Sequence, residues 1–161
     1  MHYPAGLLWR RSIPGPFHDA RFAAFIVLLA ALFCTTAAHA QSADGTWLTQ
    51  AGDARVKISK CGSGICGHIV WLREPYDTST GQPATDSKNP NPGLAKRPMI
   101  GLPLFSGMEP AGPNKWAGQI YNADDGSTYA SSISLTGADS LRVEGCVGAL
   151  CGGETWTRAG R

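Results

Sequence analysis

The sequence predicts an all-β protein, folded as a small antiparallel up-and-down barrel of about eight strands with one long proline-rich loop. Three observations support this prediction. Apolar and polar residues alternate over short segments, and no helical period is sustained. Turn-forming residues separate the segments, and residues suited to pairing the first and last strands lie near the two ends. Closure into a barrel hides the exposed edges of such a meander.

Short alternating segments account for most of the chain after residue 44. In one of them, Val56 and Ile58 point to one face of the strand, whereas Arg55 and Lys57 point to the other. Pro103 places its own segment at a sheet edge or bulge. The segments predicted as strands are residues 45–49, 54–60, 65–72, 99–105, 115–122, 127–135, 140–146 and 153–158.

The first 40 residues have the pattern of a secretory signal peptide. Basic residues precede the apolar run of residues 22–33, and the small-residue motif AHA ends at Ala40. The run is shorter than the ~20 residues that a membrane span needs. We therefore expect cleavage near Ala40 and no stable membrane span afterwards. Residues 41–161 would form a single domain in the periplasm or outside the cell.

The charge of the predicted mature chain argues against a nucleic-acid partner. Residues 41–161 hold eleven Lys and Arg and eleven Asp and Glu, so their formal net charge is zero. No basic stripe is left to neutralise phosphates.

Four cysteines remain after cleavage, in two pairs with identical spacing: Cys61 with Cys66, and Cys146 with Cys151. An even number of cysteines in an exported chain indicates disulfides, and four cysteines allow three connectivities. We favour the two local pairs, because each would join neighbouring strands across a short turn. A four-thiolate zinc site is the alternative, and we expect no metal.

Polar residues give only weak signs of catalysis. His68 is the single histidine after residue 40, and no serine in a nucleophile setting accompanies it. Asp124 and Asp125 fit a turn better than a calcium loop. Glu74 and Asp77 lie at the start of the long loop, residues 73–98, which holds five prolines. An enzyme that uses these two carboxylates is therefore an alternative function.

Aromatic side chains on the predicted strands favour a ligand-binding interior. An eight-stranded barrel either fills its interior with side chains or holds one small ligand. Aromatic rings with isolated hydroxyls suit an apolar pocket with few polar anchors. The predicted ligand-binding residues are Trp71, Tyr76, Trp116, Tyr121, Tyr129 and Ser131.

The two ends of the predicted barrel carry a matching pair. Gly45-Thr46-Trp47 begins the first strand and Arg158 ends the last. This arrangement resembles the lipocalin pattern, in which a tryptophan of the first strand packs under an arginine of the final strand. The resemblance implies that Trp47 and Arg158 close a lipocalin-like barrel.

Longer stretches resemble one family of exported bacterial proteins. They include KCGSGICGHIVWLREPYD, KWAGQIYNADDGSTYASSISL and LRVEGCVGALCGGETWTR. These stretches, in this order, are similar to the domain of unknown function 2147 (DUF2147) over about residues 44–158. The resemblance implies a lipocalin-like barrel in the periplasm or outside the cell. It implies no catalytic residues.

The sequence thus favours a non-enzymatic module that binds a small, partly apolar molecule without a cofactor. Besides the enzyme alternative, the protein could act as a structural or envelope protein that binds a protein partner through residues 73–98.

Overall fold

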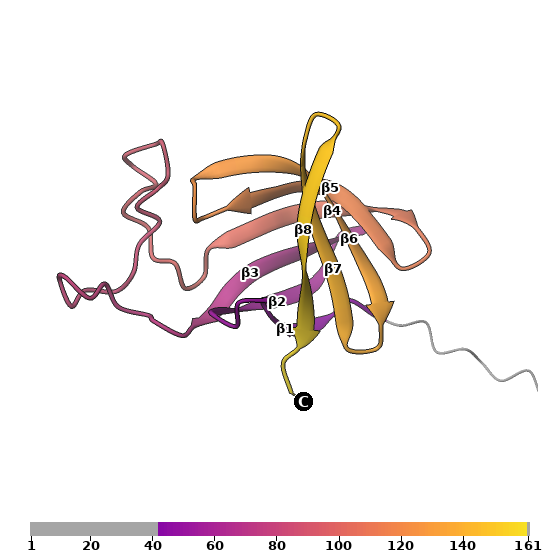
Figure 1. The fold of residues 1–161 in the computed structure, drawn as a ribbon, viewed down its shortest axis with the longest axis horizontal. Helices are drawn as coiled ribbons and strands as arrows, with labels where there is room; N and C mark the ends of the chain where they lie inside the picture. Colours follow the sequence, from indigo (N-terminus) through magenta and orange to yellow (C-terminus); the bar gives the residue numbers. More distant parts are fainter. Residues whose placement is uncertain (1–41, 161) are drawn as a thin grey trace, which may run out of the picture. The chain divides into compact units, whose positions relative to one another are not determined.

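A computed structural model describes residues 42–160, and they form a closed barrel of eight antiparallel strands (Figure 1). The order of the strands around the barrel follows the chain, and β8 returns to pair with β1. The predicted all-β up-and-down barrel is confirmed. The strands are β1 (Gly45–Leu48), β2 (Ala54–Cys61), β3 (Gly64–Leu72), β4 (Pro103–Gly112), β5 (Lys115–Asn122), β6 (Ser127–Gly137), β7 (Ser140–Val147) and β8 (Leu150–Arg158).

The predicted signal peptide, residues 1–40, lies outside the described residues, as does its cleavage site near Ala40. Within residues 42–160, no helix has the length and apolar character needed to cross a bilayer.

The predicted fourth strand was wrong in its position. It was expected at residues 99–105, but β4 begins at Pro103 and continues to Gly112. Proline is tolerated at the first position of a strand, where its missing N–H interrupts no ladder. Before β4, the chain turns at Met99, whose carbonyl accepts a hydrogen bond from the Leu102 amide.

The strand connections alternate between two ends of the barrel. The connections β1–β2, β3–β4, β5–β6 and β7–β8 gather at one end, which we call the open end. The chain enters β1 and leaves β8 at the other, closed end. Buried apolar side chains fill the core: Trp47, Val56, Ile58, Met108, Ile133 and Leu141.

Arg158 joins the first and last strands at the closed end. Its guanidinium carbon lies 4.2 Å from the centroid of the Trp47 ring. Its nitrogens donate to the carbonyls of Asp44 (2.9 Å), Ser42 (3.0 Å) and Ala138 (3.0 Å). One side chain therefore ties the entry to β1, the β6–β7 turn and β8 together. The indole N–H of Trp47 donates to the carbonyl of Ala43 at 2.8 Å.

Glycine is required at position 45 for this contact. Gly45 has φ +144, a backbone conformation that L side chains rarely adopt, and a Cβ atom there would collide with the Arg158 guanidinium. The Gly-x-Trp motif thus gives Arg158 the space to lie on the indole.

Two disulfides lie at opposite ends of the barrel. Cys61 and Cys66, whose sulfur atoms are 2.04 Å apart, join β2 to β3 at the closed end. Cys146 and Cys151 face each other across the β7–β8 hairpin at the open end. Each closes a short loop, worth about 2 kcal/mol in the loop-entropy treatment.

The closure at Arg158 generates a first prediction. Trp47→Ala removes a fully buried ring and should lower the free energy of unfolding by about 3–5 kcal/mol. Arg158→Ala leaves three carbonyls without this donor and should cost about 1–3 kcal/mol. Because both changes remove the shared cation–π contact, the double variant should lose less than the sum of the two. Chemical denaturation of all four proteins measures these losses.

Arg158→Lys is the matched control for charge. Lysine keeps the positive charge but cannot make the forked contacts of a guanidinium, so it should restore little of the lost stability. Strictly additive losses, or full rescue by lysine, would contradict the closure described above.

Candidate functional site

The interior of the barrel contains a cavity of about 980 Å³ toward the open end. Its apolar lining includes Ile69 of β3, Leu104 of β4, Ile120 of β5, Val143 of β7 and Trp156 of β8. The β1–β2, β3–β4 and β5–β6 connections contribute lining residues, and so do Val147 and Leu150, the strand residues on either side of the β7–β8 turn. The volume is at the upper end of the ~300–1,000 Å³ typical of small-molecule pockets.

A row of small residues on one wall leaves room for this cavity. Gly118 of β5 pairs with Ser131 of β6, which pairs with Gly145 of β7, which pairs with Gly152 of β8. Paired residues share a face of the sheet. Ser131 faces the interior because it alternates with the buried Ile133 along β6. Gly145 and Gly152 line the cavity, and a Cβ atom at Gly152 would meet nothing within 4 Å.

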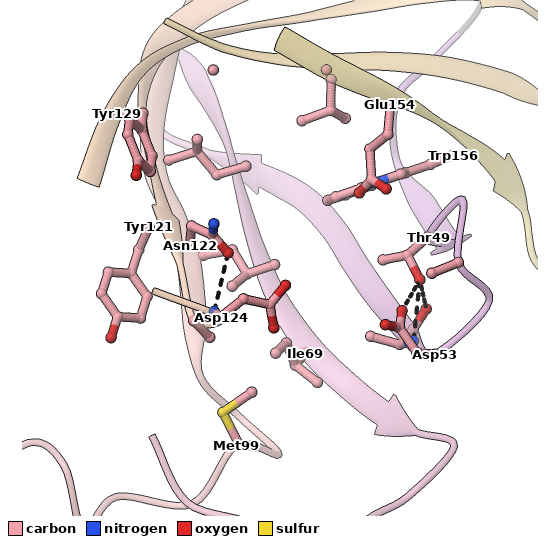
Figure 2. Close-up of a pocket in the computed structure, with 18 of the residues that line it drawn as sticks. Thr49, Asp53, Ile69, Met99, Tyr121, Asn122, Asp124, Tyr129, Glu154 and Trp156 are labelled. Atoms are coloured by element: carbon pink, nitrogen blue, oxygen red, sulfur yellow. Dashed lines mark hydrogen bonds between the residues drawn. The ribbon is translucent and has the colours of Figure 1, made fainter. Parts of the chain in front are cut away.

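Carboxylates surround the opening of the cavity. Asp53, Glu74, Asp124 and Glu154 line it, together with the guanidinium of Arg73. Figure 2 shows Asp124 reaching into the space from one side, with Asp53 and Glu154 on the other. Asp53 accepts a hydrogen bond from the Thr49 hydroxyl at 2.6 Å. An apolar floor thus lies below a negatively charged opening.

Glu154 is the half-buried member of this group. It is two residues from Trp156 on β8, so both side chains lie on the inward face. Its cross-strand partner is the buried Val143. The carboxylate accepts a hydrogen bond from the indole N–H of Trp156 (Figure 2). This hydrogen bond directs a carboxylate to the apolar wall of the cavity.

Two predicted ligand-binding residues, Tyr121 and Tyr129, line the cavity. The Tyr129 hydroxyl donates to Asp125 at 2.6 Å, and this contact raises the pKa of Tyr129 and lowers the pKa of Asp125. Trp116 packs against the core beside the cavity and is not among its lining residues. Ser131 is 7% exposed, and its hydroxyl has no hydrogen-bond partner within residues 42–160.

Trp71 and Tyr76, which were also predicted to bind the ligand, are not among the residues that line the cavity. A bulge shifts the β2–β3 register, so that Arg55 opposes Trp71 while the next residue, Val56, opposes Ile69. The extra residue turns Trp71 outward, where the Arg55 guanidinium carbon is 4.7 Å from its ring centroid. Tyr76 lies in the long loop and is 61% exposed.

The carboxylates of the alternative enzyme do not share a site. Glu74 lines the cavity, but Asp77 does not. Asp77 accepts hydrogen bonds from the hydroxyls and amides of Ser79 and Thr80, and the Ser79 hydroxyl contributes most to its lowered pKa. His68, half-buried on β3, is not among the lining residues. In the described part of the chain, no three His, Cys, Asp or Glu side chains are placed to hold a metal.

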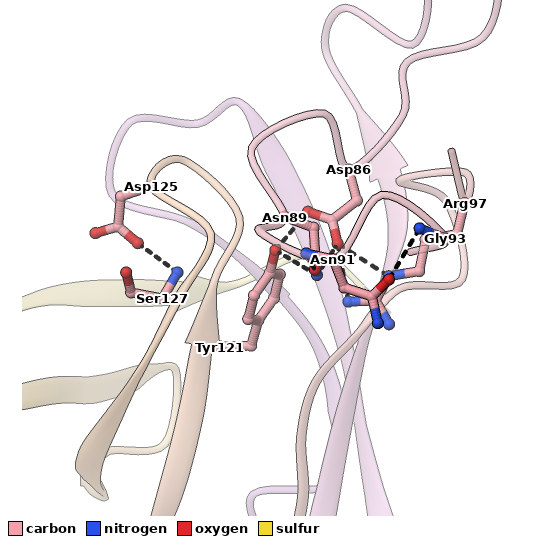
Figure 3. Close-up of polar contacts among 8 residues, drawn as sticks. All are labelled: Asp86, Asn89, Asn91, Gly93, Arg97, Tyr121, Asp125 and Ser127. Atoms are coloured by element: carbon pink, nitrogen blue, oxygen red, sulfur yellow. Dashed lines mark hydrogen bonds and ion pairs between the residues drawn. The ribbon is translucent and has the colours of Figure 1, made fainter. Parts of the chain in front are cut away.

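The long β3–β4 connection is fastened to the barrel by a buried carboxylate (Figure 3). Asp86, only 1% exposed, accepts hydrogen bonds from the Tyr121 hydroxyl (2.6 Å), the Asn89 amide (2.9 Å) and Arg97 Nε (2.9 Å). The Arg97 guanidinium carbon also lies 5.4 Å from the Tyr121 ring centroid. We call Asp86, Asn89, Arg97 and Tyr121 the Asp86 clamp.

The clamp fixes part of the cavity wall. Thr85, next to Asp86, forms a bridge with Pro98 and lines the cavity, as does Met99. Gly126, in the β5–β6 turn, has φ +74, and a Cβ atom there would collide with the carbonyl of Lys88. Glycine at this position therefore allows the long loop to lie directly on the turn.

Glu154, Asp53 and the Asp86 clamp were not predicted from the sequence. The alternation of residues in β8 was a usable signal for Glu154, since it has the same parity as Trp156. Nothing in the sequence near Asp86 indicates Tyr121 as its partner, because 35 positions separate the two residues.

Comparison with known proteins identifies the family. The model of an uncharacterized protein conserved in bacteria (DUF2147) matches residues 45–158. The chain belongs to this family. No curated protein gives a significant match to this DUF2147 protein.

A solved structure shows the same fold. The protein HP1028 from the human pathogen Helicobacter pylori, described as belonging to the lipocalin family, has a TM-score of 0.61 to this DUF2147 protein. The two share 21% sequence identity, and the match covers 74% of this chain and 84% of that chain. The barrel is thus lipocalin-like in fold.

The Asp86 clamp generates a second prediction, on pH. Burial, followed by the hydrogen bond to Asp86, raises the pKa of Tyr121 above its usual value. A raised folded-state pKa stabilises the protein fully below the unfolded value of about 10, and this stabilisation is lost as the pH rises through the folded value. The protection factors of the amides in residues 84–99, which compare their exchange with the intrinsic rate at the same pH, should therefore fall above pH ~10.

Tyr121→Phe should abolish this part of the pH dependence of hydrogen exchange. In this variant, residues 84–99 should already exchange faster than in the wild-type protein at neutral pH. The control Tyr76→Phe changes an exposed tyrosine of the same loop and leaves the clamp intact, so it should follow the wild-type protein. Equal protection of the loop in the Tyr121→Phe and wild-type proteins would contradict the clamp.

Proposed function

We propose that this DUF2147 protein is an exported binding module that holds a small, partly apolar ligand in the barrel cavity. The cavity carries this proposal: about 980 Å³ of space, an apolar floor and an opening at one end of a closed barrel. The hydrophobic effect favours an apolar molecule on such a floor, at ~25 cal/mol per Å² removed from water.

The two disulfides support an extracytoplasmic location. Disulfides persist in oxidising compartments and are rare in the cytosol. The N-terminal segment that predicts export agrees with this location.

Residues at the hairpin tip support access for an apolar molecule. Val147 and Leu150 are 67% and 82% exposed, respectively, and both line the cavity at its open end. The disulfide between Cys146 and Cys151 holds this hairpin together. An entering ligand would cover these apolar side chains as well as the floor.

Nile red, an uncharged apolar fluorophore, tests this function. It should bind one site per barrel, with a blue-shifted emission. Gly152→Trp places a ring in open cavity space. If the ring displaces roughly 60 Å² of apolar contact, affinity should fall about ten-fold. Gly160→Trp, at a glycine that also has open space but lies outside the cavity lining, is the matched control.

The proposal predicts that Gly160→Trp binds Nile red like the wild-type protein. Absence of Nile red binding, or equal binding by all three proteins, would show that the cavity is not the binding site.

The two disulfides should separate stability from binding. Replacing either pair with serines should cost about 2 kcal/mol of stability. Only the pair Cys146→Ser/Cys151→Ser should also weaken Nile red binding, because this hairpin lines the cavity. The pair Cys61→Ser/Cys66→Ser, at the closed end, is the control. Titration of both variants with Nile red measures the two affinities. An equal loss of affinity in the two variants would contradict the assignment of the open end.

A further inference from the structure

We propose that the cavity ligand carries a protonated amine on an apolar body, with Glu154 as its counter-ion. This inference rests on the proposed binding function and adds the chemical class of the ligand.

The charge of the cavity lining favours a cation. Four carboxylates and one guanidinium line the cavity, a formal net charge of −3, whereas residues 41–161 as a whole are neutral. The Arg73 guanidinium already donates to the carbonyl of Ala51 at 2.7 Å. A cavity whose lining has a net negative charge concentrates cationic ligands. It also disfavours fatty acids and other apolar anions by repulsion.

Glu154 is the carboxylate best placed to bind the amine. Its side chain lies on the inward face with Val143 and Trp156, so a cation at Glu154 leaves the apolar body on the floor. The Trp156 indole occupies one of its acceptor sites, and an ionised carboxylate has about four.

Ser131 gives an independent sign of a polar ligand group. Its hydroxyl is more than nine-tenths buried and lacks a hydrogen-bond partner within residues 42–160. Buried hydroxyls normally have one. Ser131 lies on the inward face and pairs with Gly145, which lines the cavity, whereas Ser131 itself is not among the lining residues. An amine N–H is a donor, and the Glu154 carboxylate, which lines the cavity, is an acceptor.

Glu154 could instead serve only to hold the Trp156 ring in place. The two roles differ in what they affect. A purely structural carboxylate changes stability and the binding of every ligand alike. A counter-ion discriminates between ligands that have the same apolar body and different charge.

The experiment compares three ligands with the same ten-carbon chain: decylamine, decanol and decanoate. Each displaces Nile red from the mature protein at neutral pH. Decylamine should bind about ten-fold tighter than decanol, the size of one hydrogen bond to a charged group. Decanoate should bind more weakly than decanol. Added salt should lower the affinity for decylamine and leave the affinity for decanol unchanged.

Glu154→Gln should remove the preference for decylamine over decanol. It keeps the shape of the side chain and an oxygen that can accept from the Trp156 N–H, and a melting temperature close to that of the wild-type protein shows that the variant is folded. Glu144→Gln is the matched control: Glu144 lies on β7 outside the cavity lining and contacts Arg142 at 3.4 Å. This variant should keep the full preference.

The outcomes distinguish this inference from the proposed function. Equal affinities for decylamine and decanol in the wild-type protein, or an undiminished preference in Glu154→Gln, would overturn the amine and leave the cavity function standing. If Nile red and all three ligands fail to bind, the proposed function fails, and the inference fails with it.

Discussion

The contact of Arg158 with the Trp47 indole is the interaction on which the rest of the structure depends. β1 is short, and only Trp47 and Leu48 are in register with β8. Backbone pairing over two residues is a weak closure for an eight-stranded sheet. Arg158 adds three hydrogen bonds to carbonyls and a stacked aromatic ring. Closure at this end allows the other end to remain open.

Closure of the barrel does not by itself leave space inside it. The row of small residues on one wall contributes that space. Of this row, Gly145 and Gly152 line the cavity and project no side chain into it. Below this row the inward side chains are large, among them Ile133 and Trp156. The closed end is therefore packed and stabilises the fold, while the open end has space and exposes charged groups.

The fold could be predicted further than the site. Alternating residues and turns were sufficient for eight strands and for closure, because strand periodicity is a local property. The outward direction of Trp71 could not be predicted, since one bulge opposite Arg55 reverses the face and no local residue marks it. The Asp86 clamp joins positions 35 apart through contacts that depend on the folded barrel. Glu154 was predictable in its direction, although its proximity to Asp53 and Asp124 at one opening depends on the whole topology.

A structure of the protein crystallised with decylamine tests the central claim most directly. The account predicts the amine nitrogen within hydrogen-bond distance of the Glu154 carboxylate, and the alkyl chain against Val143 and Ile69 inside the barrel. The account would be contradicted if crystals saturated with decylamine held it only on the outer surface, for example on Trp71 or beside Asp77. The cavity would then contain no decylamine.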